Sequence, residues 1–181
     1  MKISNQLRSF LGRYQLQNDQ RKFEVAHETV GFDEASRIGI LYDATEEKDF
    51  EFIKEWIKRT RTETKKDILA MGFVNKKQLP SRQFPQYGMD FFTKKDLDFK
   101  MVPTDPIVMN FINERYDILI NLHTGNCFPL QYIATLSKSR FRVGIYNKKH
   151  ITPYELMINL KGNPGIKEAL EETVLFLKKI K

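Results

Sequence analysis

The chain has 181 residues, of which 41% are hydrophobic and 29% are charged. Disordered and fibrous proteins do not have this composition. No apolar run approaches the roughly 20 residues that span a bilayer, and the N-terminus lacks the apolar segment of a signal peptide. Cys127 is the only cysteine, which excludes an internal disulfide and a cysteine-rich metal site. We therefore expect a cytoplasmic protein with one globular domain.

The net charge favours an acidic partner. Lysine and arginine number 30 against 23 acidic residues, a formal charge of +7. Basic surfaces attract polyanions through electrostatic steering and the release of counterions. RNA, a ribonucleoprotein or another acidic surface is the expected class of partner.

Residues 1–30 predict a basic amphipathic helix that is an appendage to the main domain at residues 37–181. Its apolar positions follow helical spacing: Ile3, Leu7, Phe10, Leu11 and Tyr14. One interpretation is a surface that docks on a protein partner, a membrane surface or nucleic acid. The other is packing within the chain, which is the expected arrangement because most amphipathic helices bury their apolar stripe in this way.

Residues 37–43 and 67–74 are apolar runs typical of buried parallel strands. Between them we expect a helix that begins after Thr45 and ends near Arg61, with the Thr45 hydroxyl as its cap. Glu46 and Glu47 complement the positive end of the helix dipole. Because these acids would repel a phosphate and no glycine-rich fingerprint is present, we expect no dinucleotide cofactor here.

Residues 75–104 form the least regular region and interleave basic with aromatic side chains. A short strand at residues 89–92 is expected at the edge of the sheet. Cations among aromatics can bind single-stranded nucleic acid through backbone attraction and base stacking. The alternative, which we favour, is that the aromatics pack inward and the lysines are solvated. The residues are Lys76, Lys77, Arg82, Lys94, Lys95 and Lys100, with Phe84, Tyr87, Phe91, Phe92 and Phe99.

The remainder alternates helices and strands. A helix from Thr104-Asp105-Pro106 is followed by a strand at 117–122, a helix at 130–138, strands at 141–145 and 154–160, and a terminal helix capped at Asn163-Pro164. This alternation predicts a single α/β domain of the Rossmann-like type, with three layers and a mainly parallel sheet of five or six strands.

The turns that follow two central strands are the candidate ligand site. In such folds, ligands bind at the carboxyl ends of the strands, where the strand order reverses. If strand 37–43 neighbours strand 117–122, their turns meet there. The second turn opens a helix without acidic residues, whose free amides could receive an anion. The candidate residues are Asp43, Thr45, His123, Thr124, Gly125, Asn126 and Cys127.

Catalytic or metal-binding roles for the residues of these turns have weaker support. A cysteine at a helix N-terminus can have a lowered pKa and could be activated by His123, but Cys127 is more simply a small buried hydrophobe. Asp43 could act as a base, but a carboxylate that caps its own turn is the simpler interpretation. Asp43, His123 and His150 lack the spacing of a metal site. The motifs of common nucleotide-binding, hydrolytic and metalloenzyme families are absent, so we predict no catalytic residue, metal or cofactor.

Tyr116-Asp117 and the strand Phe141-Arg142-Val143-Gly144 resemble a segment of heptosyltransferase-type glycosyltransferases. In the N-terminal domain of those enzymes, a Tyr-Asp strand leads through a helix to an Arg-x-Gly strand. The resemblance implies a Rossmann-like unit, but those enzymes bind the nucleotide sugar in a second domain that this chain lacks. The whole chain also resembles short, basic, uncharacterised bacterial α/β proteins.

The leading hypothesis from the sequence is a non-catalytic protein that binds an acidic partner through basic surfaces. Two alternatives stay open, a small anionic-ligand or glycosyltransferase-like site at the candidate turns, and a scaffold subunit that associates through the N-terminal helix. The candidate polyanion-binding residues are Arg8, Arg13, Arg21, Lys22, Lys76, Lys77, Arg82, Lys94 and Lys95.

Overall fold

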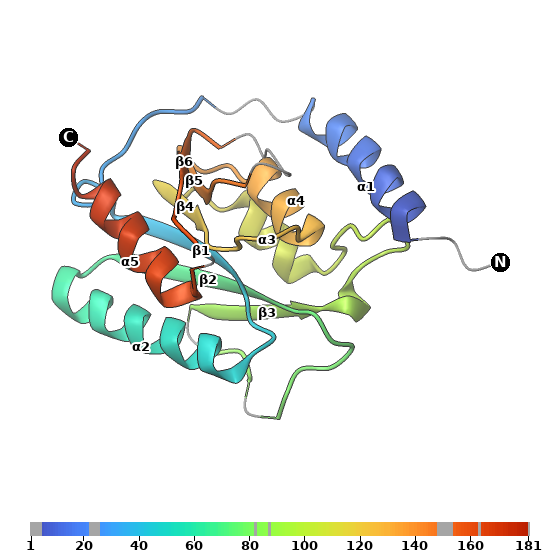
Figure 1. Ribbon diagram of the computed structural model, residues 1–181, viewed down its shortest axis with the longest axis horizontal. Helices are drawn as coiled ribbons and strands as arrows, with labels where there is room; N and C mark the ends of the chain where they lie inside the picture. Colours follow the sequence, from blue (N-terminus) through green and yellow to red (C-terminus); the bar gives the residue numbers. More distant parts are fainter. Residues whose placement is uncertain are drawn as a thin grey trace.

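The computed structural model describes residues 5–21, 26–81, 83–86, 88–147, 154–162 and 164–180. Within these residues the centre is a sheet of six parallel strands in the order β3-β2-β1-β4-β5-β6 (Figure 1). The strands are β1 (Arg37–Asp43), β2 (Asp67–Val74), β3 (Met89–Thr93), β4 (Ile118–Asn121), β5 (Phe141–Ile145) and β6 (Leu156–Ile158). The predicted Rossmann-like α/β fold is confirmed, and β3 lies at the sheet edge as expected.

Helices cover both faces of this sheet. One apolar core joins α2 and α5 to the sheet, and a second core on the opposite face joins α3 and α4 (Figure 1). The short helix η1 follows β3, and α1 packs on α4 with Leu16 against the second core. The helices are α1 (Asn5–Gln20), α2 (Glu47–Thr64), η1 (Lys94–Asp96), α3 (Pro106–Asn113), α4 (Phe128–Leu136) and α5 (Ile166–Leu177).

Three helix starts differ from the sequence-based expectation. Helix α2 begins after Glu46, and Thr45 does not cap it because its hydroxyl accepts a hydrogen bond from the Asn75 N–H at 2.9 Å. Helix α4 begins at Phe128, two residues early, since Pro129 suits a first turn. Helix α5 begins at Ile166 after Gly165, and the expected cap at Asn163 lies outside the described residues.

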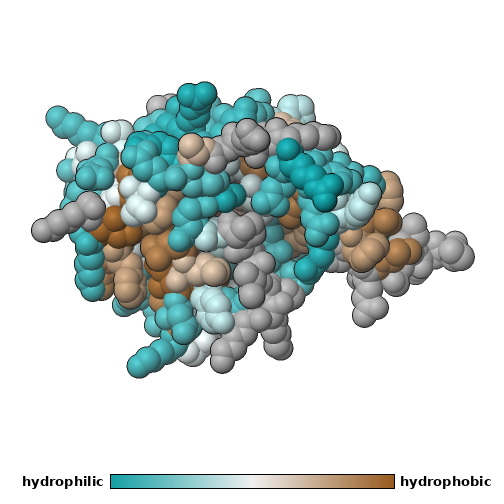
Figure 2. Space-filling view, turned by 90° about the horizontal axis from the view of Figure 1, so that it is seen from above, coloured by the Kyte–Doolittle hydropathy of each residue, from teal (hydrophilic) through white to brown (hydrophobic). Residues whose placement is uncertain are grey.

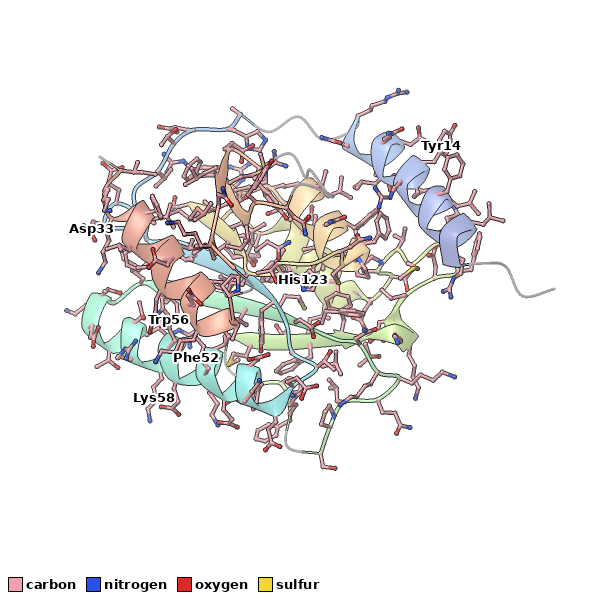
Figure 3. The ribbon with its side chains drawn as sticks, viewed as in Figure 1. Tyr14, Asp33, Phe52, Trp56, Lys58 and His123 are labelled. Atoms are coloured by element: carbon pink, nitrogen blue, oxygen red, sulfur yellow. The ribbon has the colours of Figure 1, made fainter. Side chains whose placement is uncertain are left out.

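Helix α1 packs on the chain through a different face from the one its apolar spacing predicts. A Cβ on Gly12 would lie 2.8 Å from the Phe128 ring, so glycine allows the helix backbone to come close. Asp19 accepts a hydrogen bond from the Tyr132 hydroxyl at 2.8 Å and further fixes this face. The expectation of a buried stripe is wrong for Phe10 and Tyr14, which are 66% and 62% exposed. Figure 3 shows Tyr14 on the side of α1 that faces away from the sheet.

Candidate functional site

A pocket of about 390 Å³ opens where the strand order reverses, between the carboxyl ends of β1 and β4. The condition set for this site, that the two strands are neighbours, is met. The turns after β1 and β4 form one part of the wall, and the starts of α2 and α5 form another. We call this the switch-point pocket. Its lining is Asp43, Thr45, Glu46, Lys48, Asp49, Asn75, Leu122, His123, Thr124, Pro164, Gly165 and Ile166.

The turn after β1 is held by its own hydrogen bonds. Asp43 Oδ1 accepts from the Thr45 N–H at 2.9 Å, which confirms the interpretation of Asp43 as a carboxylate that caps its own turn. The Thr45 side chain in turn bonds to the backbone of Asn75 at the end of β2. Lys76 Nζ lies 3.4 Å from the Thr45 carbonyl oxygen. The β1 wall is therefore braced against the turn that follows β2.

The turn after β4 is equally constrained. The His123 N–H donates to Asn121 Oδ1 at 3.1 Å, and Asn147 Nδ2 donates to the Thr124 carbonyl at 2.8 Å. Figure 3 shows His123 near the centre of the molecule. Burial lowers the pKa of His123 more than the nearby charge of Asp43 raises it. The imidazole is therefore neutral near pH 7 and can both donate and accept a hydrogen bond.

The structure separates the seven candidate ligand residues into two groups. Asp43, Thr45, His123 and Thr124 line the switch-point pocket, whereas Gly125, Asn126 and Cys127 do not belong to its described lining. A Cβ on Gly125 would lie 3.0 Å from His123 Nε2, so the imidazole occupies the space in which a ligand would approach that backbone.

Cys127 is not an activated thiol. It is 8% exposed, and burial raises its pKa to about 12. The backbone N–H of Leu130 lowers this pKa, but desolvation of the thiolate outweighs that contribution. The lowered pKa that a helix N-terminus could have produced is therefore absent, and the interpretation of Cys127 as a buried hydrophobe is confirmed.

Carboxylates outnumber cations among the described residues that line the pocket. Of these residues, Asp43, Glu46 and Asp49 are acidic and Lys48 is basic. The pKa of Asp49 is raised by burial and by the charges of Asp43 and Glu46, while Lys48 opposes the shift. In the part of the chain that the structure describes, no group of three metal-ligating side chains is placed to hold a metal ion. Such a pocket suits a ligand that presents hydrogen-bond donors or positive charge to this wall.

The sequence-based prediction missed the contribution of α5 and of Asp49. Gly165 and Ile166 line the pocket from the start of α5. A usable signal exists, because every helix that follows a strand of a parallel sheet begins at the carboxyl edge of that sheet. Asp49 is one helical turn beyond Thr45, and its position follows from the orientation of α2 over the edge.

The candidate polyanion-binding residues gather partly at the same sheet edge. The Lys94 N–H donates to the Lys76 carbonyl at 3.0 Å, so the exposed pairs Lys76-Lys77 and Lys94-Lys95 lie side by side. Arg8 Nε donates to the Phe99 carbonyl at 2.8 Å, which joins α1 to this region. We call the four lysines the lysine cluster. The remaining candidates are Arg13, exposed on α1, Arg21, exposed just after its end, and Lys22 and Arg82, outside the described residues.

The aromatic residues of this region separate in the same way. Phe91 and Phe92 are core residues, 7% and 0% exposed, as the favoured interpretation predicts. Phe84 and Phe99 are instead 59% and 56% exposed, while Tyr87 lies outside the described residues. The inward-packing interpretation therefore holds for the strand and fails for the two loop residues.

The residues that carry the glycosyltransferase resemblance have structural roles in this chain. Asp117 Oδ2 accepts from the N–H groups of Ser36 and Arg37 at 2.8 and 2.9 Å and ties the starts of β1 and β4 together. Arg142 donates to Glu155 and, at 2.9 Å, to the Thr135 carbonyl. These contacts account for both side chains without a ligand.

In the described residues, no helix is both long enough and apolar enough to cross a membrane. No curated protein and no solved structure matches the chain. A family model, that of a family of unknown function named DUF6913, matches residues 8–180 and thus includes α1 with the α/β domain. The chain belongs to the DUF6913 family.

Proposed function

We propose that the protein binds a small polar ligand in the switch-point pocket. The observation that carries the proposal is the position of this cavity, at the one place where a doubly wound sheet leaves a crevice between diverging crossovers. Its volume of about 390 Å³ falls in the range of small-molecule sites. The side chains that line it are mostly polar, which favours a polar ligand over an apolar one.

The charge of the pocket restricts the class of ligand. Asp43, Glu46 and Asp49 repel an anion at the β1 and α2 wall. A primary amine or guanidinium would be attracted to this wall, and the neutral His123 and the Thr124 hydroxyl offer further hydrogen bonds. An amine-bearing metabolite therefore fits better than the anionic ligand that the sequence suggested.

The test is a titration of the isotope-labelled protein with four probes: arginine, spermidine, inorganic phosphate and a nucleotide sugar. The nucleotide sugar is included because of the resemblance of Tyr116–Gly144 to glycosyltransferases. Arginine or spermidine is expected to shift the amide signals of His123 and Thr124 and to raise Tm. At 100 times Kd the stabilisation is about 2.7 kcal/mol.

Two variants of α2 distinguish pocket binding from general attraction to acidic residues. Asp49→Asn removes a carboxylate of the pocket, whereas Glu55→Gln removes one from the exposed surface of the same helix. Asp49→Asn is expected to weaken amine binding about two- to fivefold, and Glu55→Gln to leave it unchanged. Equal effects of both variants, or no amine-induced shift at His123 and Thr124, would contradict the proposal.

We infer a second candidate function, binding of an acidic partner such as RNA through the lysine cluster. The hydrogen bond from the Lys94 N–H to the Lys76 carbonyl supports it, because it brings the two lysine pairs together on one exposed surface. Nearby acids are engaged by backbone groups. Asp96 accepts from the Thr93 N–H, and Asp98 accepts from the Lys100 N–H at 2.7 Å.

A salt titration of binding to single-stranded RNA tests this candidate. The double variant Lys94→Gln/Lys95→Gln is expected to reduce the slope of log K against log salt by about 1.4, or about 0.7 for each phosphate that the variant no longer neutralises. The control Lys58→Gln/Arg59→Gln removes two exposed charges from α2 and should leave the slope unchanged. Binding that is absent at low salt, or a slope that both double variants change equally, excludes the lysine cluster as the RNA surface.

A further inference from the structure

We propose that the outer face of α1 together with Phe99 is a peripheral docking surface for an anionic lipid bilayer. This interaction is independent of the switch-point pocket and of the lysine cluster. It is carried by large apolar side chains that the fold leaves outside both cores, in a setting of positive charge.

The apolar part of this surface is continuous along α1. Phe10 and Tyr14, 66% and 62% exposed, are four residues apart and so share one side of the helix. Leu7 is 48% exposed one turn earlier. Phe99, 56% exposed, is fixed beside the helix because Arg8 Nε donates to its carbonyl oxygen at 2.8 Å. In Figure 2, hydrophobic surface is visible at the projecting end of the molecule on the right, where α1 begins.

This exposure follows from the way α1 is fixed to the chain. Gly12 lies against the Phe128 ring, Asp19 bonds to the Tyr132 hydroxyl, and Gln15 Oε1 accepts from Lys100 Nζ at 3.2 Å. These polar and glycine positions hold the inner face in place. The aromatic face therefore points outward, where its exposure to water is unfavourable unless a partner covers it.

The charge of α1 favours an anionic lipid surface over a second copy of the chain as the partner that covers this face. In the described residues, α1 carries Arg8 and Arg13, and Arg21 follows its end, whereas its one acid, Asp19, is turned inward onto Tyr132. A second copy of the chain would bring arginines against arginines, which disfavours self-association. An anionic lipid surface attracts these arginines and offers an apolar layer to the aromatic side chains.

The position of α1 also favours a bilayer. The helix lies on the outside of the molecule, away from the sheet (Figure 1). Phenylalanine and tyrosine on such a helix insert at the boundary between headgroups and acyl chains, while arginine remains among the headgroups. The helix would lie in the plane of the membrane surface and would not cross it.

The experiment measures cosedimentation of the full chain with vesicles of phosphatidylcholine alone, or of phosphatidylcholine mixed with phosphatidylglycerol. Binding is expected only to the anionic vesicles, and it should weaken as salt is added. Phe10→Ser/Tyr14→Ser should reduce binding at least about tenfold. The control Leu175→Ser/Phe176→Ser removes two exposed apolar side chains, 49% and 45% exposed, from α5 and should bind as the wild type does.

The competing occupants are tested with the same variants. Single-stranded RNA binding that is lost in Phe10→Ser/Tyr14→Ser, without vesicle binding by the wild type, would overturn the proposal in favour of nucleic acid. A wild-type dimer that this variant converts to a monomer would overturn it in favour of a second copy. Equal vesicle binding by both double variants, or no binding to anionic vesicles at low salt, would also overturn it. Both variants change exposed side chains, and an unchanged Tm confirms that each is folded.

Discussion

The ion pair between Arg142 and Glu155 should be the most sensitive charged contact in the fold. Arg142 lies on β5, between β4 and the edge strand β6, with a side chain only 7% exposed. Glu155 precedes β6 and bonds to Arg142 Nη2 at 2.6 Å and to its backbone N–H at 2.7 Å. Arg142 Nη1 also donates to the Thr135 carbonyl of α4. One guanidinium therefore joins β5, the segment before β6 and α4.

Glu155→Gln should destabilise the protein by about 3 kcal/mol, because it leaves the buried guanidinium of Arg142 without a countercharge. We take the lower end of the usual range because the Glu155 side chain is 21% exposed. For a chain of this length, the same loss lowers Tm by about 6 to 12 °C. Urea unfolding followed by circular dichroism measures the free energy, and calorimetry measures Tm.

The pH dependence is a separate check. Burial raises the pKa of Glu155, but the hydrogen bonds and charge of Arg142 outweigh burial, so the net shift is downward. A carboxylate with a lowered pKa in the folded state stabilises the fold above its unfolded pKa, and this contribution is lost as the pH falls through the folded value. The difference between wild type and Glu155→Gln should therefore be complete at pH 7 and shrink below about pH 4.3.

Two further variants make the reasoning refutable. Glu51→Gln removes the acid of the Glu51–Lys54 pair, whose side chains are 45% and 36% exposed, and should cost less than about 0.5 kcal/mol. Arg142→Met/Glu155→Leu removes both charges of the pair and should cost less than Glu155→Gln alone. The reasoning fails if Glu155→Gln lies within about 1 kcal/mol of the wild type, or if its effect is as large at pH 3 as at pH 7.

Three other predictions concern α1, the single cysteine and the start of the sheet. In most helices a Gly→Ala substitution stabilises by about 1 kcal/mol. Gly12→Ala should instead loosen α1, because its Cβ would meet the Lys100 carbonyl oxygen. Hydrogen exchange of residues 10–20 should then become faster, and slower exchange would contradict the close packing of Gly12. Burial raises the pKa of Cys127 to about 12. The thiol should therefore react with iodoacetamide at pH 8 at least about 1,000-fold more slowly in the native protein than in guanidinium. Comparable rates would refute its burial. The pKa of Asp117 is raised by burial but lowered more by the N–H groups of Ser36 and Arg37 and by Arg140. Asp117→Asn should therefore cost about 1–2 kcal/mol at pH 7 and progressively less as the pH falls below about 3.9, as urea unfolding across this pH range would show.

The positions of the central strands along the chain were predictable, because a strand that is buried on both faces is an unmixed apolar run. Their order in the sheet was not. Residues 37–43 and 67–74 become β1 and β2 with the bounds that their apolar runs indicate. The terminal strand was less predictable. Residues 154–160 contain a strand of only three residues, Leu156–Ile158, because β6 is an edge strand with one pairing partner. The apolar pattern of a segment therefore predicts the bounds of a strand best where that strand pairs with another strand on each side.

The candidate site was predictable to the extent that sheet topology determines it. Asp43 and His123 follow β1 and β4, and the rule that ligands bind at the carboxyl edge brings them together. Gly125 was also expected there, but it does not belong to the described lining of the pocket. His123 occupies the space beside Gly125, and no local pattern reveals where its imidazole turns.

Helix α1 shows a different limit of sequence interpretation. The spacing of Phe10 and Tyr14 correctly predicts a helix, but periodicity does not reveal which face meets the body of the protein. Packing selects the face with Gly12, where the backbone can approach Phe128 most closely. Steric access at one glycine thus outweighs the apolar stripe, since the stripe's side chains are too large for that contact.

The turn after β2 links the switch-point pocket to the lysine cluster. The Asn75 N–H donates to the Thr45 hydroxyl, and the Lys76 carbonyl accepts from the Lys94 N–H. Asn75 therefore holds the pocket wall at Thr45, and the next residue, Lys76, pairs with Lys94 of the lysine cluster. Thr45 and Asn75 therefore belong both to the pocket wall and to the contact with the turn that carries Lys76, whereas Asp49 lines the pocket alone and Lys95 belongs to the lysine cluster alone.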